Sequence, residues 1–99
     1  MTRSGWTQSR RATSDLIEIR NYTVATWGKE QARLYLVGIK SAIERAASAD
    51  PSHRKSCGDE LPGYFRIVVG SHVVFYRAIE DSIRVERILH QRMDFESHL

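Results

Sequence analysis

The sequence is poor in cysteine, proline and lysine, and it contains no long hydrophobic run. Its single cysteine, Cys57, cannot form an internal disulfide, which favours a reduced compartment. No apolar run approaches the ~18 residues that a membrane span needs. The N-terminal stretch MTRSGWTQSRR lacks the apolar core of a secretory signal. We therefore expect a cytoplasmic protein that does not associate with a membrane.

Positive charge comes mainly from arginine. The chain has a net charge of +3, and its only lysines are Lys29, Lys40 and Lys55. Arginine pairs in bidentate fashion with carboxylate or phosphate, so an acidic partner fits this composition, whether protein or nucleic acid. The alternative is that most arginines form an ordinary solvated surface. A charge of +3 is too small to indicate nucleic-acid binding by itself, which disfavours a plain DNA-binding module.

The last third of the chain organises the rest, because two turn signals divide it into three apolar runs. These runs are rich in Val, Ile, Tyr and Phe, as β-strands are, and cover residues 63–69, 72–79 and 82–89. Gly70-Ser71 predicts a type II′ hairpin turn, since glycine takes its first central position. That turn sets Val69 opposite His72, Ile67 opposite Val74 and Phe65 opposite Tyr76.

The predicted hairpin is apolar on both faces. The core face carries Phe65, Ile67, Val69, Val74 and Tyr76. The second face mixes apolar side chains with two cations and carries Tyr64, Arg66, Val68, Val73, Phe75 and Arg77. Since the helices of this chain should cover one face, we expect the second to meet a partner. Truncating Phe75 to alanine should then weaken partner binding more than folding.

The first half of the chain predicts a short strand and two helices. The strand covers residues 5–8, and Ser9 is a suitable N-cap for a helix over residues 10–27. Gly28 ends that helix and begins a second one, which stops at Asp50-Pro51. Its apolar stripe contains Ala32, Tyr35, Leu36, Ile39, Ile43 and Ala46. Asp15 lies too far into the first helix to cap it, and we expect a weak surface pair with Arg11 or Arg20.

The remaining segments are connections. Residues 51–62 form a polar link between the second helix and the strands, and the end of the chain after Met93 is either a short helical turn or a tail. Met93, Phe95 and Leu99 give this end enough apolar side chain to pack on the body. The chain is therefore one α+β domain over residues 1–99, with the order βααβββ. Its helical hairpin packs on a three- to four-stranded, mainly antiparallel sheet.

Three sequence patterns resemble a known family. The first is S-x-x-A-x-x-D-L-x-x-I-x-x-Y, from Ser9 to Tyr22. The second is Trp27-Gly28 followed by A-x-x-Y-x-x-x-I, from Ala32 to Ile39. The third is R-I-L-H-x-R-x-D, from Arg87 to Asp94. In order and spacing they resemble the ParE toxins of the RelE/ParE superfamily of type II toxin–antitoxin modules.

This resemblance implies the βααβββ fold and a function. It implies a ParD-like antitoxin that forms a hetero-oligomer with the toxin, wraps it with a C-terminal segment and carries all DNA binding. It also implies DNA gyrase as the poisoned target. No cofactor is expected, and a toxin of this kind acts by binding, without a catalytic site of its own.

The RelE branch of the superfamily implies the alternative, a ribosome-dependent mRNA endonuclease. Such an enzyme needs cations around the scissile phosphate and a general base. His90 is the candidate base, with Arg87 and Arg92 on the phosphate. The other interpretation is that His90 bonds a backbone carbonyl or Asp94 and fixes the chain after the last strand. His53, His72, His90 and His98 are scattered and Cys57 stands alone, so we expect no metal site.

Arginine beside aromatic residues is typical of protein interfaces. We therefore predict a surface for antitoxin or target that contains Tyr64, Arg66, Phe75, Arg77, Arg84, Arg87, His90 and Arg92. The alternative is that the strand arginines pair within the chain with Glu60, Glu80 or Glu86.

Overall fold

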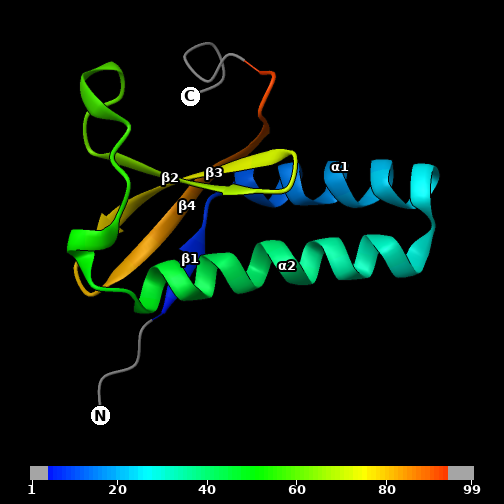
Figure 1. Cartoon of the computed structure of the whole chain (residues 1–99), viewed down its shortest axis with the longest axis horizontal. Coiled ribbons are helices and arrows are strands. Elements are labelled where there is room, and N and C mark those ends of the chain that lie inside the picture. Colours follow the sequence, from blue (N-terminus) through cyan, green and yellow to red (C-terminus); the bar gives the residue numbers. More distant parts are fainter. Residues whose placement is uncertain (1–4, 94–99) are drawn as a thin grey trace.

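The computed structural model describes residues 5–93 and contains two long helices and a four-stranded sheet (Figure 1). The helices are α1 (Arg10–Trp27) and α2 (Lys29–Ser48). The strands are β1 (Trp6–Gln8), β2 (Tyr64–Val69), β3 (His72–Ile79) and β4 (Ser82–His90). Two short 3-10 turns, η1 (Pro51–His53) and η2 (Gly58–Glu60), lie in the polar connection. The predicted α+β order βααβββ is confirmed, whereas the tail predicted after Met93 lies outside the described residues.

The sheet has the order β1-β4-β3-β2, with β1 parallel to β4 and the other two pairs antiparallel. The predicted hairpin register is confirmed, with Val69 opposite His72 and Phe65 opposite Tyr76. Gly70 has a φ of +58°. Ser71 is not among the residues with a positive φ. A type II′ turn requires this combination, with a positive φ at its first central residue only. The turn therefore sets which side chains of β2 and β3 share a face.

The second hairpin turn places a side chain where glycine is favoured. Glu80, between β3 and β4, has a φ of +52°. We expect Glu80→Gly to raise the free energy of unfolding by roughly 0.5–1 kcal/mol, because it relieves the Cβ contact at positive φ. Urea denaturation measures this change. The neighbouring control Asp81→Gly should destabilise instead, since Asp81 does not adopt a positive φ.

Helix α1 begins at Ser9 and runs beside β4 after β1 has ended. The Ser9 side-chain oxygen accepts a hydrogen bond from the Ala12 N–H at 3.0 Å, and its hydroxyl donates to the Glu86 carbonyl at 2.7 Å. Gly28 has a φ of +95° and joins the two helices directly. The helices lie antiparallel and reach well beyond the end of the sheet (Figure 1). Their distant end is therefore not supported by strands.

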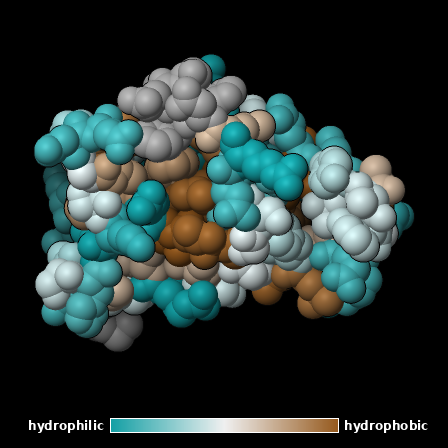
Figure 2. All heavy atoms as spheres, turned by 45° about the horizontal axis from the view of Figure 1, so that its top comes forward, coloured by the Kyte–Doolittle hydropathy of each residue, from teal (hydrophilic) through white to brown (hydrophobic). Residues whose placement is uncertain are grey.

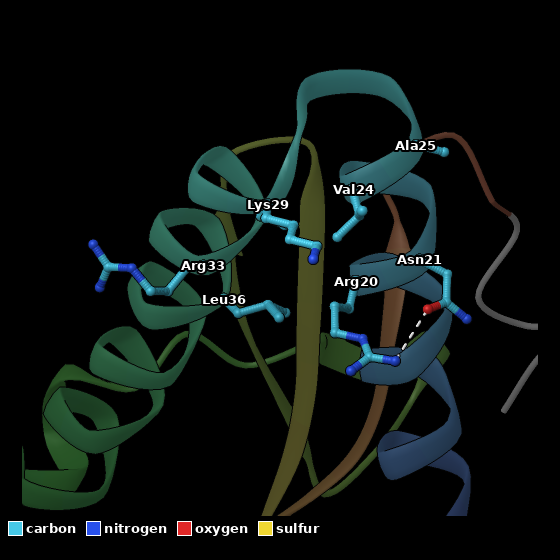
Figure 3. Close-up of a pocket in the computed structure, with 8 residues that line it drawn as sticks. Arg20, Asn21, Val24, Ala25, Lys29, Arg33 and Leu36 are labelled. Atoms are coloured by element: carbon cyan, nitrogen blue, oxygen red, sulfur yellow. Dashed lines mark hydrogen bonds between the residues drawn. The ribbon is translucent and has the colours of Figure 1, made fainter.

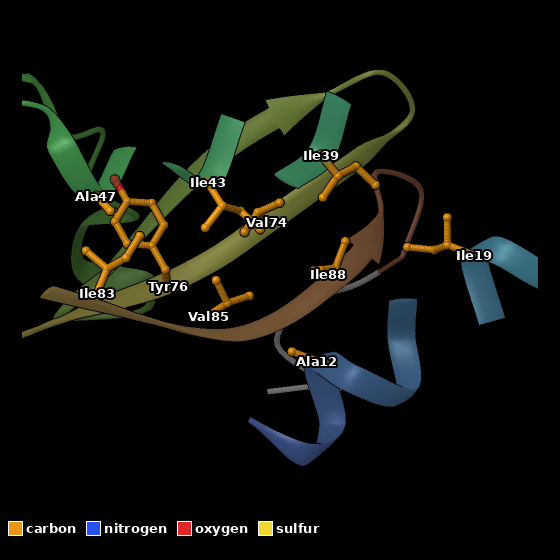
Figure 4. Close-up of a cluster of buried hydrophobic side chains, with 10 residues drawn as sticks. All are labelled: Ala12, Ile19, Ile39, Ile43, Ala47, Val74, Tyr76, Ile83, Val85 and Ile88. Carbon is orange, nitrogen blue, oxygen red and sulfur yellow. The ribbon is translucent and has the colours of Figure 1, made fainter. Parts of the chain in front are cut away.

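The core lies between the helices and one face of the sheet (Figure 4). Strand β4 contributes one extra residue, Glu86, between the pairs Phe75–Arg87 and Tyr76–Val85. This irregularity lets β4 bury Val85 and Ile88, three residues apart, in the same core. The complete cluster contains Ala12, Ile19, Ile39, Ile43, Ala47, Val74, Tyr76, Ile83, Val85 and Ile88.

The second face of the hairpin is only partly uncovered. Val68 is 62% exposed and Arg66 and Arg77 are exposed, as expected for a face that meets a partner. Phe75 is only 4% exposed and therefore belongs to the buried part of the molecule. The expectation that Phe75 lies on open surface was wrong, because strand alternation assigns a side chain to a face but does not show what covers it. Truncation of Phe75 should therefore reduce folding stability itself.

Candidate functional site

Asp15 and Arg87 form a buried ion pair between α1 and β4. Arg87 donates from Nε to Asp15 Oδ2 at 2.8 Å and from Nη2 to Oδ1 at 2.9 Å. The Ile88 backbone N–H donates to Asp15 Oδ2 at 2.9 Å. The side chains keep only 13% exposure at Arg87 and 9% at Asp15. The hydrogen bonds to Asp15 raise the pKa of Arg87, so the guanidinium stays charged.

The expected surface pairing of Asp15 with Arg11 or Arg20 was wrong. Asp15 is buried, and the Arg20 side chain bonds Asn21 at 3.2 Å. The true partner lies 72 residues away along the chain and meets Asp15 only when α1 packs beside β4. The carboxylate occupies the edge of β4 that β1 leaves unpaired, which explains why it bonds both Arg87 and the Ile88 N–H.

Tyr35 of α2 connects the helices to the β2–β3 turn. Its hydroxyl lies 2.6 Å from His72 Nδ1 and 3.2 Å from the Val69 carbonyl oxygen, and it accepts from the Ser71 N–H at 3.1 Å. The His72 ring in turn packs edge-on against His90, with centroids 5.4 Å apart. Sequence reasoning assigned Tyr35 to the core and found no role for His72. The available signal was a polar ring directly after a tight turn.

Burial lowers the pKa of His72, and the neighbouring His90 lowers it further. The unfolded chain therefore binds a proton at His72 more readily than the folded chain does. Stability from neutral His72 is present above the ordinary histidine pKa of about 6.5 and is lost as the pH falls through the depressed folded value. We expect the free energy of unfolding to fall between pH 7.5 and 5, with a smaller slope in His72→Gln. Urea titrations at several pH values measure both slopes, and equal slopes would contradict this coupling.

The ion pair and the histidines border a cavity of about 550 Å³. Its other lining residues come from α1, β4 and the segment after β4, and they are Glu18, Ile19, Tyr22, Ile88, Leu89 and Met93. His90 Nδ1 accepts from the Arg92 N–H at 3.2 Å, so this histidine fixes the chain after β4 through an amide donor. The expected bond to a carbonyl is not the one formed, and Asp94 lies outside the described residues. Asp15 matches the charge of Arg87. The cavity is therefore better suited to binding than to stabilising the extra negative charge on the phosphate in the transition state of RNA cleavage.

The predicted cations of the sheet surface are held by a carboxylate of β4. Glu86 lies 3.5 Å from Arg84 and 3.9 Å from Arg77, which confirms an intramolecular pairing with Glu86. The Arg77 guanidinium also lies 5.6 Å from the centroid of Tyr64. Pairs this exposed add little stability and leave the arginines able to exchange partners. On the face shown in Figure 2, apolar side chains gather near the centre among hydrophilic ones.

A groove between the helices, which sequence reasoning missed, has a largely apolar lining (Figure 3). It encloses about 620 Å³ at the end of the helical hairpin that reaches beyond the sheet. Val24, Ala25, Ala32 and Leu36 form its apolar lining, and Arg20, Asn21, Lys29 and Arg33 complete it. Trp27, at the same end, is 69% exposed. Apolar residues of α1 outside its core stripe were the signal that could have indicated this groove.

Two kinds of site are absent from the described part of the chain. Among residues 5–93, no three His, Cys, Asp or Glu side chains are grouped so that they could hold a metal ion. In the same range, neither helix has the length and apolarity to cross a bilayer.

Comparison with known proteins assigns the family. The model of the ParE toxin of the type II toxin–antitoxin system parDE matches residues 7–95. Toxin ParE1 of Mycobacterium tuberculosis H37Rv is 44% identical over 89 residues, which cover 89% of this chain and 90% of the relative. Toxin ParE1 of Caulobacter vibrioides is 42% identical over 93 residues, covering 92% and 93% respectively.

Solved structures show the same fold at lower identity. A structure described as the chromosomal ParDE TA system from P. aeruginosa superposes with a TM-score of 0.76 at 18% identity, covering 87% of this chain and 94% of that one. The E. coli DinJ–YafQ toxin–antitoxin complex gives a TM-score of 0.58 at 13% identity, with 90% and 93% covered. The sequence relatives and the family match together show that this chain belongs to the ParE family of type II toxin–antitoxin toxins.

Proposed function

We propose that this toxin inhibits growth by binding and poisoning DNA gyrase, and that a ParD-like antitoxin keeps it inactive in a hetero-oligomer. The family description names parDE, and the similar P. aeruginosa structure is described as a ParDE system. The observation that carries the proposal is the apolar groove between the helices, which the described part of the chain leaves open. A small toxin with such a surface needs a partner to cover it, and a segment that folds on binding can bury a large area.

The chemistry of the groove selects the occupant. Its apolar floor suits a row of aliphatic side chains, and Arg20, Lys29 and Arg33 at its rim suit carboxylates. Arg33 also pairs with Glu30 at 2.6 Å, but both side chains are mostly exposed and can rearrange. We propose that an acidic, amphipathic segment of the antitoxin lies in this groove, with apolar anchors inward and carboxylates toward the rim.

Placing a carboxylate on the apolar floor should disrupt this contact. We expect Val24→Asp to weaken antitoxin affinity at least tenfold, about 1.4 kcal/mol, because the new carboxylate must be desolvated beneath the apolar anchors of the segment and repels its carboxylates. Titration calorimetry with the cognate ParD-like antitoxin measures the change in affinity. The matched control is Val37→Asp on α2, at a residue that is 49% exposed and does not line the groove. Equal affinity of the two variants would place the antitoxin elsewhere.

The predicted surface residues remain part of the proposal. Arg66, Arg77 and Arg84, beside Tyr64, are proposed to meet carboxylates of the antitoxin or the target, and they are exposed or half-exposed. We propose that His90, Arg87 and Arg92 contribute to binding and not to catalysis, because the Arg87 guanidinium already forms an ion pair with Asp15. DNA binding is proposed to reside in the antitoxin alone, so the isolated toxin should not retard a DNA fragment in a mobility-shift gel.

Paired assays test the mode of action. Purified toxin should inhibit supercoiling by gyrase, stabilise cleaved DNA, and lose both effects when the antitoxin is added. It should leave mRNA intact on translating ribosomes. The reverse result, mRNA cleavage that disappears in His90→Ala with gyrase unaffected, would replace gyrase poisoning by the RelE-type endonuclease activity.

A further inference from the structure

A second hollow, at the edge strand β2, is lined by cations without a matching carboxylate. It encloses about 270 Å³ where the end of α2 and residues 53–55 meet β2. Its basic lining residues are Arg45, His53, Arg54, Lys55 and Arg66, and its remaining lining residues are Ala42, Ala46, Ala49, Ile67 and Tyr76. No aspartate or glutamate lines it, and among residues 5–93 no ion pair reaches any of its arginines or its lysine.

Two side chains that line this hollow have unused hydrogen-bonding capacity. The Nε of Arg54 is fully buried and has no hydrogen-bond partner, although the guanidinium lies 5.8 Å from the centroid of Phe65. Such an orphaned donor costs about 1–3 kcal/mol, so it indicates a ligand or water. Tyr76 is 2% exposed, and its hydroxyl forms no hydrogen bond within the described residues. Burial raises the pKa of Tyr76, which keeps this hydroxyl protonated as a donor.

The charge balance around the hollow favours an anion. The end of α2 contributes the partial negative charge of a helix C-terminus, about half an elementary charge, and Arg45 in the last turn offsets it. Asp50, between the end of α2 and residues 53–55, accepts from the Ser52 N–H at 2.9 Å as the cap of η1. Arg54, Lys55 and Arg66 therefore stay uncompensated, which amounts to three full positive charges around a small volume.

We propose that this pocket binds the dianionic phosphate group of a small molecule, either inorganic phosphate or a phosphate monoester. Arginine forks and a hydroxyl donor match the several acceptor oxygens of a phosphate. A carboxylate would leave most of the positive charge unmatched. The volume is slightly below the range of ~300–1,000 Å³ that drug-sized ligands occupy, and so it suits a phosphate with a small attached group. The site is distinct from the groove between the helices and does not depend on gyrase as the target.

Titration calorimetry of the full-length chain, with inorganic phosphate or adenosine 5′-monophosphate, tests the site. At pH 7.5 we expect saturable binding with a Kd of about 1 mM or tighter, and no heat from chloride at equal ionic strength. Tighter binding of the nucleotide would identify a monoester as the ligand, and equal binding would identify free phosphate.

Two substitutions and a control make the assignment specific. Arg54→Gln and Arg66→Gln should each weaken binding at least tenfold, whereas Arg10→Gln, at an exposed arginine of α1 that does not line the pocket, should leave it unchanged. If circular dichroism shows that Arg54→Gln is unfolded, the exposed Lys55→Gln takes its place beside Arg66→Gln. Absence of saturation at tens of millimolar phosphate, or equal loss in Arg10→Gln, would overturn the proposal.

Discussion

Asp15→Asn is expected to lower the free energy of unfolding by about 3–5 kcal/mol, because it removes the buried carboxylate that holds the Arg87 guanidinium through two hydrogen bonds. The substitution keeps the size of the side chain and removes only its charge. A domain of this size has roughly 5–15 kcal/mol of stability in total, so the variant should lose a large share of it. The melting temperature should fall by more than about 10 °C. Urea denaturation followed by circular dichroism gives the free energy directly.

The ion pair between Glu30 and Arg33 supplies a matched control. Its oxygen–nitrogen distance of 2.6 Å is shorter than any in the Asp15–Arg87 pair, but its side chains are 71% and 61% exposed. We expect Glu30→Gln to leave the unfolding curve unchanged, since water replaces the lost partner. The double variant Asp15→Asn/Arg87→Gln should be more stable than the sum of its single effects predicts. A stability of Asp15→Asn close to that of the parent would show that the pair is dispensable.

Gly70→Ala is expected to destabilise the protein by about 2–4 kcal/mol through two additive causes. The residue has a φ of +58°, where a Cβ is unfavourable. A Cβ at this position would also lie 2.7 Å from Cε1 and 2.8 Å from the hydroxyl oxygen of Tyr35. The ring cannot move aside freely, because its hydroxyl is bonded to the turn and to His72.

Gly58→Ala separates the two causes. Gly58 has a φ of +74°, yet nothing lies within 4 Å of a Cβ built there. It should therefore show the backbone cost alone, about 1 kcal/mol. Thermal and urea denaturation of both variants measure the difference. If Gly70→Ala is no less stable than Gly58→Ala, the contact between Tyr35 and the turn does not restrain the hairpin.

Local sequence was sufficient for the elements of this fold. The Gly70-Ser71 turn and the two-residue period of the strands predicted the register that pairs Phe65 with Tyr76. Ser9 and Gly28 predicted both ends of the first helix, since caps and positive-φ positions depend on immediate neighbours. The family resemblance was likewise visible in short spaced patterns from Ser9 to Asp94, and the comparisons confirmed it.

Only the tertiary structure decided which polar groups meet and which surfaces stay open. Asp15 pairs with Arg87, and Tyr35 forms a hydrogen bond with His72, across sequence separations that no local pattern encodes. Phe75 shares a strand face with exposed cations and is nevertheless buried. The groove between the helices and the cationic pocket beside β2 each combine residues from separate elements. The physical reason is that side-chain periodicity sets direction within one element, whereas burial and pairing depend on what packs against it.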